Sequence, residues 1–142
     1  MFGLTPAGTK LDYTINELMI FLKVIVKRGL IGMIIVKILM NALPEKRKEV
    51  LQTLLSMIEV IRQEKGCRSY HVFQDIQNEN IFCLVEKWET REDLEHHMRS
   101  DRFSVLLGTK ILLENEDQEI QVHTVLNTEG REIVNAVRGQ RI

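Results

Sequence analysis

The spacing of hydrophobic residues changes along the chain, and each spacing predicts a different kind of element. A β-branched and apolar run over 34–40 predicts a buried strand, and later runs over 68–76 and 81–88 predict a hairpin. Apolar residues at helical spacing after Pro44 predict an amphipathic helix. The remaining predicted elements are helices beginning after Thr90 and Ser100, a strand over 120–126, and a loose helix or extended arm over 129–142.

Polar residues and glycine mark where several of these elements begin and end. Lys65 and Gly66 are expected to close the first helix with a basic last turn and a left-handed cap. Thr90 and Asp93 resemble a capping box at the start of the next helix. These signals divide the chain into the order β-α-β-β-α-α-β.

This order predicts an α+β fold with a ferredoxin-like antiparallel sheet and helices on one of its faces. The other face of so small a sheet would be bare, yet its strands carry many apolar residues. Packing against a second copy of the chain would cover that face, so we expect a homodimer formed through the sheet.

Residues 1–32 follow a different pattern and are predicted to be an extension of a domain over 33–142. Apolar residues over 15–26 have helical spacing, but a bilayer span takes about 20 apolar residues, and Lys23 interrupts this run. Three interpretations stay open: a translated leader ahead of a start at Met33, which we favour, a packing helix, or an interfacial membrane helix. The leader interpretation has a specific basis, because Lys27-Arg28-Gly29 can be encoded by codons that resemble a ribosome-binding site.

Composition narrows the classes of function. The 142 residues are 44% hydrophobic and 27% charged, with a formal net charge of -1 and interspersed signs. This balance argues against a nucleic-acid-binding surface, which concentrates Lys and Arg on one face. No cleavable signal peptide is evident, and Cys67 and Cys83 do not form a metal-ligand pair. We therefore expect a cytoplasmic protein with reduced thiols and neither a stable membrane span nor a metal site.

The predicted hairpin places candidate chemistry on one face of the sheet. A turn closed symmetrically about Asn78 and Glu79 would set His71 opposite Glu86, with Trp88 on the same face. A nearby carboxylate favours the imidazolium form, so this pair could hold or deliver a proton near neutral pH. The alternative is a half-exposed cross-strand ion pair that only supports strand pairing.

The next helix carries two adjacent histidines that must point in different directions. At 100° per residue, His97 lies about 60° from core-facing Leu94, whereas His96 lies about 160° away. We expect His97 at the interior and His96 in solvent.

Several motifs together resemble the antibiotic-biosynthesis-monooxygenase family. These are the run from Leu84 to Thr90 with its Glu86-Lys87-Trp88, the Leu94-Glu95-His96-His97 segment, the Ser100-Asp101-Arg102-Phe103 turn, and the Gly66-Cys67-Arg68-Ser69-Tyr70 segment before the second strand. The resemblance covers residues 33 to about 127. It implies a ferredoxin-like subunit that pairs into a dimeric α/β barrel, with a pocket between sheet and helices.

Some members of this family oxygenate quinols or other electron-rich aromatics with O₂ and without a cofactor. The resemblance implies His97 as base or hydrogen-bond partner, Glu86 as an orienting group and Trp88 as a surface for a substrate ring. His71 joins them as a third catalytic candidate through the hairpin register. Arg102 stands where quinol-oxidising relatives carry a second histidine, and an arginine there could hold a phenolate or carboxylate. The substrate-binding candidates are Trp88, Arg102, Phe103 and Tyr70.

Three functions remain open at this point. The first is a cofactor-independent monooxygenase acting on a quinol-like aromatic, and the second is a non-catalytic dimer that binds a small hydrophobic metabolite. The third is an isomerase or degradative enzyme for a small oxygenated metabolite. A monooxygenase must consume O₂ with its substrate, whereas a binding protein only shifts its melting temperature.

Overall fold

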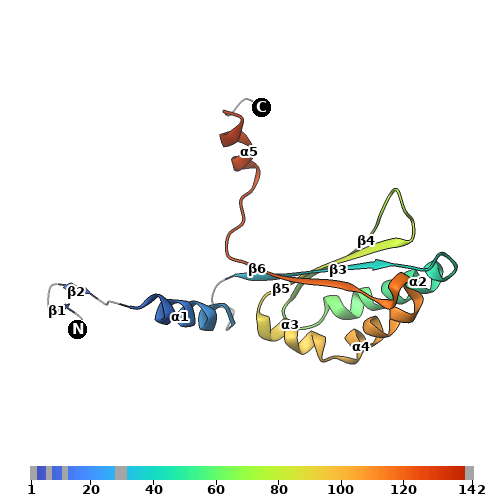
Figure 1. Ribbon diagram of the computed structural model, residues 1–142, viewed down its shortest axis with the longest axis horizontal. Coiled ribbons are helices and arrows are strands. Elements are labelled where there is room, and N and C mark those ends of the chain that lie inside the picture. Colours follow the sequence, from blue (N-terminus) through green and yellow to red (C-terminus); the bar gives the residue numbers. More distant parts are fainter. Residues whose placement is uncertain (1–2, 6–7, 11–12, 28–31, 140–142) are drawn as a thin grey trace.

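The computed structural model describes residues 3–5, 8–10, 13–27 and 32–139. The domain contains one antiparallel sheet with strand order β4-β5-β3-β6, and its helices lie on one face of that sheet (Figure 1). The predicted order of elements and the ferredoxin-like subunit are confirmed. The domain elements are β3 (Met33–Asn41), the 3-10 turn η1 (Pro44–Lys46), α2 (Arg47–Arg62), β4 (Cys67–Gln74), β5 (Ile81–Trp88), α3 (Arg91–Met98), α4 (Asp101–Gly108), the 3-10 turns η2 (Thr109–Leu112) and η3 (Glu114–Glu116), and β6 (Glu119–Val125).

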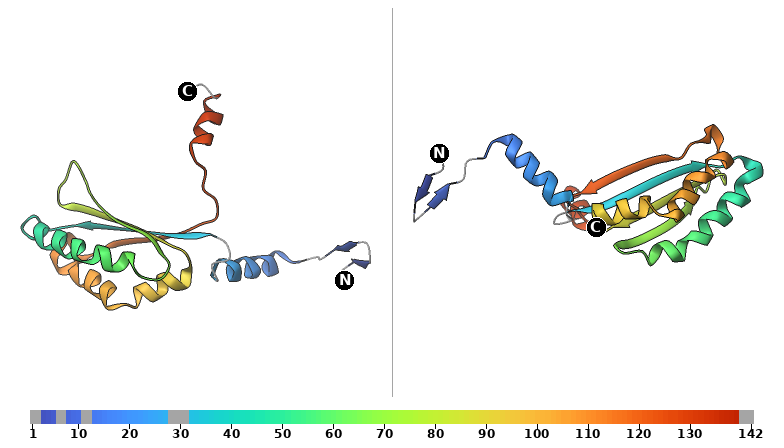
Figure 2. Two further views of the ribbon diagram at one scale, coloured as in Figure 1. Left: turned by 180° about the vertical axis from the view of Figure 1, so that it is seen from behind. Right: turned by 90° about the horizontal axis from the view of Figure 1, so that it is seen from below.

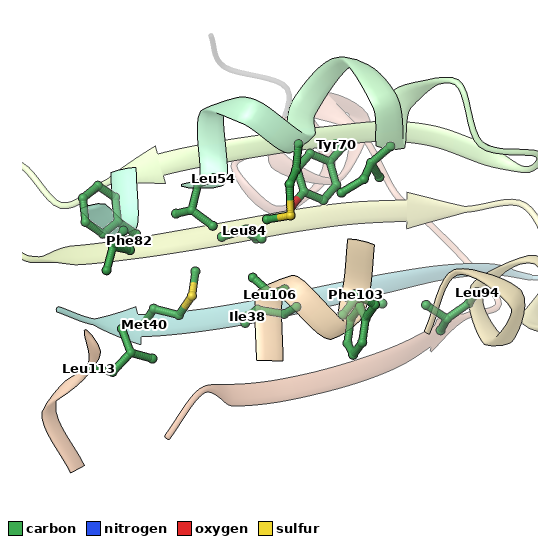
Figure 3. Close-up of a cluster of buried hydrophobic side chains, with 14 of the residues drawn as sticks. Ile38, Met40, Leu54, Tyr70, Phe82, Leu84, Leu94, Phe103, Leu106 and Leu113 are labelled. Atoms are coloured by element: carbon green, nitrogen blue, oxygen red, sulfur yellow. The ribbon is translucent and has the colours of Figure 1, made fainter. Parts of the chain in front are cut away.

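Alternation along the central strand β3 separates the two faces of the sheet. Every second residue of this strand from Ile34 to Met40 is buried under the helices, while Lys37 on the other face is exposed. Side chains from β4 and β5 and from all three helices complete the core (Figure 3). The labelled core side chains in that view are Ile38, Met40, Leu54, Tyr70, Phe82, Leu84, Leu94, Phe103, Leu106 and Leu113.

Both predicted helix starts are confirmed by side-chain caps. The hydroxyl oxygen of Thr90 accepts a hydrogen bond from the backbone N–H of Asp93 at 3.0 Å. The hydroxyl oxygen of Ser100 accepts one from the backbone N–H of Phe103 at 3.2 Å. Each cap pairs a donor that a helix would otherwise leave free, so α3 and α4 begin at defined residues.

The first helix of the domain ends earlier than the pattern predicts. Helix α2 ends at Arg62, and residues 63–66 form a turn before β4 begins. Gly66 has φ of +80°, the left-handed conformation that glycine adopts most readily, and a Cβ there would lie 2.1 Å from a carboxylate oxygen of Asp93. This close approach lets the turn after α2 pack against the start of α3.

The β4–β5 hairpin does not have the register that a symmetric turn predicts. Tyr70, and not His71, pairs with Glu86, and His71 pairs with Val85. Asp75 causes the difference: its carboxylate accepts hydrogen bonds from two backbone N–H groups of the loop, at 2.7 and 2.9 Å. Its own N–H donates to the carbonyl of Ile81 at 3.0 Å, which closes a longer loop and shifts the pairing by one residue.

Among the described residues, no helix packs against the second face of the sheet (Figure 2). The chain after β6 leaves on this open side and forms α5 (Arg131–Val137), so the predicted tail contains a helix. Three apolar side chains of α5, Ile133, Val134 and Val137, are exposed. The open face is defined by its apolar members, which are Met33, Ile35, Leu39, Phe73, Ile81, Cys83, Val85 and Val125.

The segment before β3 holds the short strands β1 (Gly3–Thr5) and β2 (Gly8–Lys10), which pair with each other, and helix α1 (Ile15–Lys27). The predicted helix over 15–26 is therefore present. Its apolar side chains are largely exposed, with Phe21 at 64%. Among the described residues, no helix has the length and apolar content that crossing a bilayer requires. The leader, packing and interfacial interpretations of this segment stay predictions.

Candidate functional site

A buried polar cluster lies between the sheet and the helices, where a hydrophobic core would otherwise be continuous. Glu86 and Trp88 point from β5 toward the helices, and His97 points from α3 toward the sheet. Their exposed fractions are 0%, 0% and 1%. The helical-angle prediction for His97 is confirmed, and His96 is exposed as expected. Burying ionisable groups is costly unless they are paired, so their partners decide what this cluster can do.

Trp88 and Phe103 hold the imidazole ring in place. The indole of Trp88 stacks on the ring of His97 with centroids 4.6 Å apart, and Phe103 of α4 meets that ring edge-on at 5.3 Å. The indole N–H also donates to Glu86 at 2.8 Å, which orients the carboxylate. In this structure the indole of Trp88 therefore stacks on the ring of His97, whereas the sequence predicted that a substrate ring would stack there.

Glu64 belongs to the cluster, although the sequence analysis did not identify it. It lies in the turn after α2, and its carboxylate is 2.7 Å from Nδ1 of His97. Its other oxygen accepts a hydrogen bond from Arg102 of α4 at 2.8 Å. One signal could have pointed to it: an acidic residue close to a helix C-terminus opposes the helix dipole.

Among the described residues, three polar atoms of the cluster, besides Nε of Arg102, are buried and have no hydrogen-bond partner. They are the hydroxyl oxygen of Tyr70, Oε1 of Glu86 and Nε2 of His97. The last two face each other at 3.7 Å, beyond the length of a good hydrogen bond. Tyr70 lies directly across the β4–β5 ladder from Glu86 and is fully buried. Unpaired buried polar atoms are rare in proteins, and three of them on the Tyr70–Glu86 strand pair and on His97 make this cluster the candidate site.

The charges in the cluster determine which groups hold protons. Burial by itself lowers the pKa of His97, but the carboxylates of Glu86 and Glu64 outweigh it and raise that pKa above its usual value. Burial, assisted by the charge of Glu86, raises the pKa of Tyr70 far above its usual range, so its hydroxyl keeps its proton. The two carboxyl groups therefore favour the protonated form of His97, and Tyr70 contributes a neutral hydroxyl.

His71 does not join this cluster. The shifted register places it on the open side of the sheet, where it is exposed and lies against Phe73. The prediction of His71 as a catalytic residue therefore has no support in the geometry. The two cysteines are free thiols, and burial raises the pKa of Cys67 to about 11.

The cluster is closed to solvent in this conformation. Glu86, Trp88 and His97 have almost no accessible surface. A surface depression of about 300 Å³ lies outside the Glu64–Arg102 pair, and its lining residues are Val60, Gln63, Glu64, Lys65, His96 and Arg102. The Glu64–Arg102 ion pair thus separates the buried cluster from this depression. Among the described residues, no group of three His, Cys, Asp or Glu side chains has an arrangement that could hold a metal ion.

The sequence and fold have relatives among known proteins. The Bacillus subtilis protein named "Putative monooxygenase YcnE" is 31% identical over 82 residues, which cover 56% of this chain and 86% of that protein. The uncharacterized protein sll1783 of Synechocystis is 28% identical over 86 residues, 61% of this chain and 58% of that protein, so the chain spans little more than half of that relative. The crystal structure of a conserved protein from Methanosarcina mazei superposes with a TM-score of 0.61 at 29% identity, covering 68% of this chain and 95% of that one.

The family match falls on the segment that contains the buried cluster. Residues 33–106, more than half of the 142-residue chain, match the family described as antibiotic biosynthesis monooxygenase. The matched segment runs from β3 into α4 and includes Glu64, Glu86, Trp88 and His97. The chain therefore belongs to the antibiotic biosynthesis monooxygenase family.

Proposed function

We propose that the protein is a cofactor-independent monooxygenase that oxidises a quinol or similar electron-rich aromatic with O₂. One observation carries this proposal: Oε1 of Glu86 and Nε2 of His97 face each other unpaired at 3.7 Å inside the core, and the hydroxyl of Tyr70, the residue across the ladder from Glu86, is also unpaired. A phenolic substrate offers the matching chemistry, because its ring suits the aromatic walls and its hydroxyl can pair with those atoms.

The chemistry balances without an added electron donor. Oxidation of a hydroquinone to a hydroxyquinone releases four electrons, which is what the reduction of one O₂ requires. One oxygen atom enters the ring, and the other leaves as water. The protein has to remove a proton from the substrate, stabilise the anion formed and hold it in a dry site.

We assign a role to each residue from the charges of the cluster. Glu86 is the group that accepts the phenolic proton, since its free Oε1 faces the unpaired atoms. His97, protonated because its pKa is raised, stabilises the resulting phenolate as a cation. Tyr70 donates its hydroxyl to the same oxygen, and Trp88 keeps Glu86 oriented. The base is thus Glu86, and His97 acts as an electrostatic partner.

Binding requires the cluster to open. Arg102 is the most exposed member of the group, with a side chain 39% accessible, and its contact with Glu64 lies at the depression. Displacement of the Arg102 side chain would connect the depression to the interior. Arg102 can then pair with a substrate anion in place of Glu64.

We also propose that the open face of the sheet packs against a second copy of the chain. Its apolar members lie on all four strands of the sheet, and most are only half-buried in a single chain. The same face carries both acidic and basic residues, such as Glu119 and Lys37, so it is compatible with its own copy in a two-fold arrangement. Helix α5, whose apolar side chains are exposed, lies on this side too (Figure 1), where a second subunit would cover them.

Oxygen uptake tests the proposed reaction. Chelator-treated protein is mixed with a panel of reduced quinols, and the rate is compared with autoxidation for the wild type, His97→Gln and the matched control His71→Gln. We expect uptake in the wild type and in His71→Gln, and a loss of about 100-fold or more in His97→Gln. Because the His97 variant leaves two carboxylates without their cation, its folding is checked by circular dichroism, and Tyr70→Phe serves as a second variant.

Two results would contradict the proposal. If no quinol is consumed but some raise the melting temperature, the chain is a binding protein. If a substrate is converted equally fast without O₂, the reaction is an isomerisation or another non-oxidative step.

A further inference from the structure

The carboxylate of Glu64 connects the surface of the molecule to the buried imidazole. It pairs with Arg102 at 2.8 Å on one side and with Nδ1 of His97 at 2.7 Å on the other, and its side chain is 8% exposed. A carboxylate can only accept hydrogen bonds, so the His97 contact requires the proton to be on Nδ1. Nε2 is then the ring nitrogen that faces Glu86.

We propose that Glu64 is a positioning residue, which holds His97 with its Nδ1–H outward so that Nε2 faces the buried centre. When the ring is neutral, Nε2 carries a lone pair toward the carboxylate of Glu86. When the ring is protonated, Nε2–H points toward the unpaired oxygen of Glu86. Glu64 therefore decides which ring nitrogen takes part in the chemistry, as the hydrogen bond at the second nitrogen of a histidine generally does.

The local structure supports this assignment. Two contacts hold Glu64 in place. Its turn ends at Gly66, which packs against α3, and Arg102 of α4 donates a hydrogen bond to its second carboxylate oxygen. The backbone at the end of α2 is also tied to the sheet, since the guanidinium of Arg62 donates to the carbonyl of Tyr70 at 2.9 and 3.0 Å. A carboxylate anchored in this way can orient a ring that rotates about its own side-chain bonds.

The charged and titratable groups that face the imidazole come from several elements, and each is consistent with Glu64 holding Nδ1 of His97. Glu86 approaches from β5, Glu64 from the turn after α2, and Arg102 from α4 through its contact with Glu64. Tyr70 and Cys67 lie on β4, and the charges of Glu86 and Glu64 act on both of them. Within the described residues, Glu64 is the group within hydrogen-bond distance of a ring nitrogen of His97.

The ¹⁵N spectrum of His97 tests the tautomer directly. Histidine-labelled wild-type protein is titrated, and the His97 signal is assigned by its loss in His97→Gln. We expect the neutral ring to carry its proton on Nδ1, and we expect the His97 pKa to fall in Glu64→Gln because one facing charge is lost. The matched control is Glu59→Gln, which removes a carboxylate of α2 whose contact is the exposed Arg62. A neutral ring protonated on Nε2 in the wild type would overturn the proposal, and so would an unchanged pKa in Glu64→Gln.

The kinetic consequence rests on the proposed monooxygenase function. We expect Glu64→Gln to lower kcat for quinol-dependent oxygen uptake by about 10- to 100-fold with little change in KM, since a positioning partner is lost while the buried groups remain. Glu59→Gln should leave both constants unchanged. A wild type that consumes no oxygen would refute the proposed function but leave the NMR result to decide the role of Glu64. A changed tautomer together with unchanged kcat would refute the positioning role.

Discussion

Tyr70 lies directly opposite Glu86 on the β4–β5 ladder, and its hydroxyl is buried without a hydrogen-bond partner. A buried hydroxyl without a partner lowers stability, because it has lost its hydrogen bonds to water and forms none within the protein. The structure provides no packing reason for a hydroxyl at this position, where phenylalanine would have the same shape. In the proposed function this hydroxyl donates to the substrate oxygen.

Tyr70→Phe separates a structural role from a functional one. We expect the free energy of unfolding to stay the same or rise by up to about 1 kcal/mol, because an unsatisfied buried hydroxyl is removed. Quinol-dependent oxygen uptake should fall at least about tenfold, since a donor to the substrate oxygen is lost. Urea unfolding and an oxygen electrode measure the two effects, and Tyr13→Phe, at an exposed position of the N-terminal segment, is the control. A clear loss of stability with full activity would show that the hydroxyl serves the fold.

The raised pKa of His97 makes stability depend on pH with a definite sign. Between the ordinary value of 6.5 and the higher folded value, the native state binds more protons than the unfolded chain. The contribution of His97 is complete below 6.5 and is lost as the pH rises through the folded pKa. Urea titrations from pH 5 to pH 9 should show the free energy of unfolding falling across this window. The decrease should persist in His96→Gln and disappear in His97→Gln; a rise with pH in the wild type would mean that burial outweighs the carboxylates.

Gly66 is predicted to be the least replaceable glycine of the domain. An alanine there must adopt φ near +80°, which costs about 1–2 kcal/mol, and its Cβ would collide with Asp93. We expect Gly66→Ala to lower the melting temperature and to weaken the contact between Glu64 and His97, visible as a shifted His97 resonance. Gly108→Ala is the matched control, because that position is helical and open, and it should be neutral or stabilising. Equal melting temperatures for the two variants would contradict the strain inferred at Gly66.

A charge on the open face of the sheet should separate the proposed dimer. Leu39→Lys places an ammonium group in the middle of β3 on that face, where a second subunit would bury it. Light scattering after gel filtration should give twice the chain mass for the wild type and the single-chain mass for this variant. Leu55→Lys, at an exposed position of α2 on the helix side, should leave the dimer intact. A wild type that elutes as a single chain at micromolar concentration would refute the proposed interface.

The sequence by itself was sufficient for most features that depend on neighbouring residues, although α2 ends at Arg62 and not at Gly66. The period of the hydrophobic pattern located the strands and helices, and the capping residues Thr90 and Ser100 located the starts of α3 and α4. The helical angle of 100° per residue predicted that His97 faces the interior. These effects act over one or two turns of chain. The resemblance to the family rests on the same local segments and led to Glu86, Trp88 and His97.

Only the tertiary structure decided which side chains from distant segments meet. The carboxylate of Asp75 closes the hairpin loop, and the resulting register places Tyr70 on the face of the site and His71 on the open face. Glu64 reaches His97, 33 positions away, because the turn at Gly66 lets α2 and α3 approach closely. A hydrophobic pattern indicates which positions face the core, but it does not indicate which of those side chains contact one another. Register and long-range contacts therefore depend on loop geometry and packing, which act between segments that the sequence keeps apart.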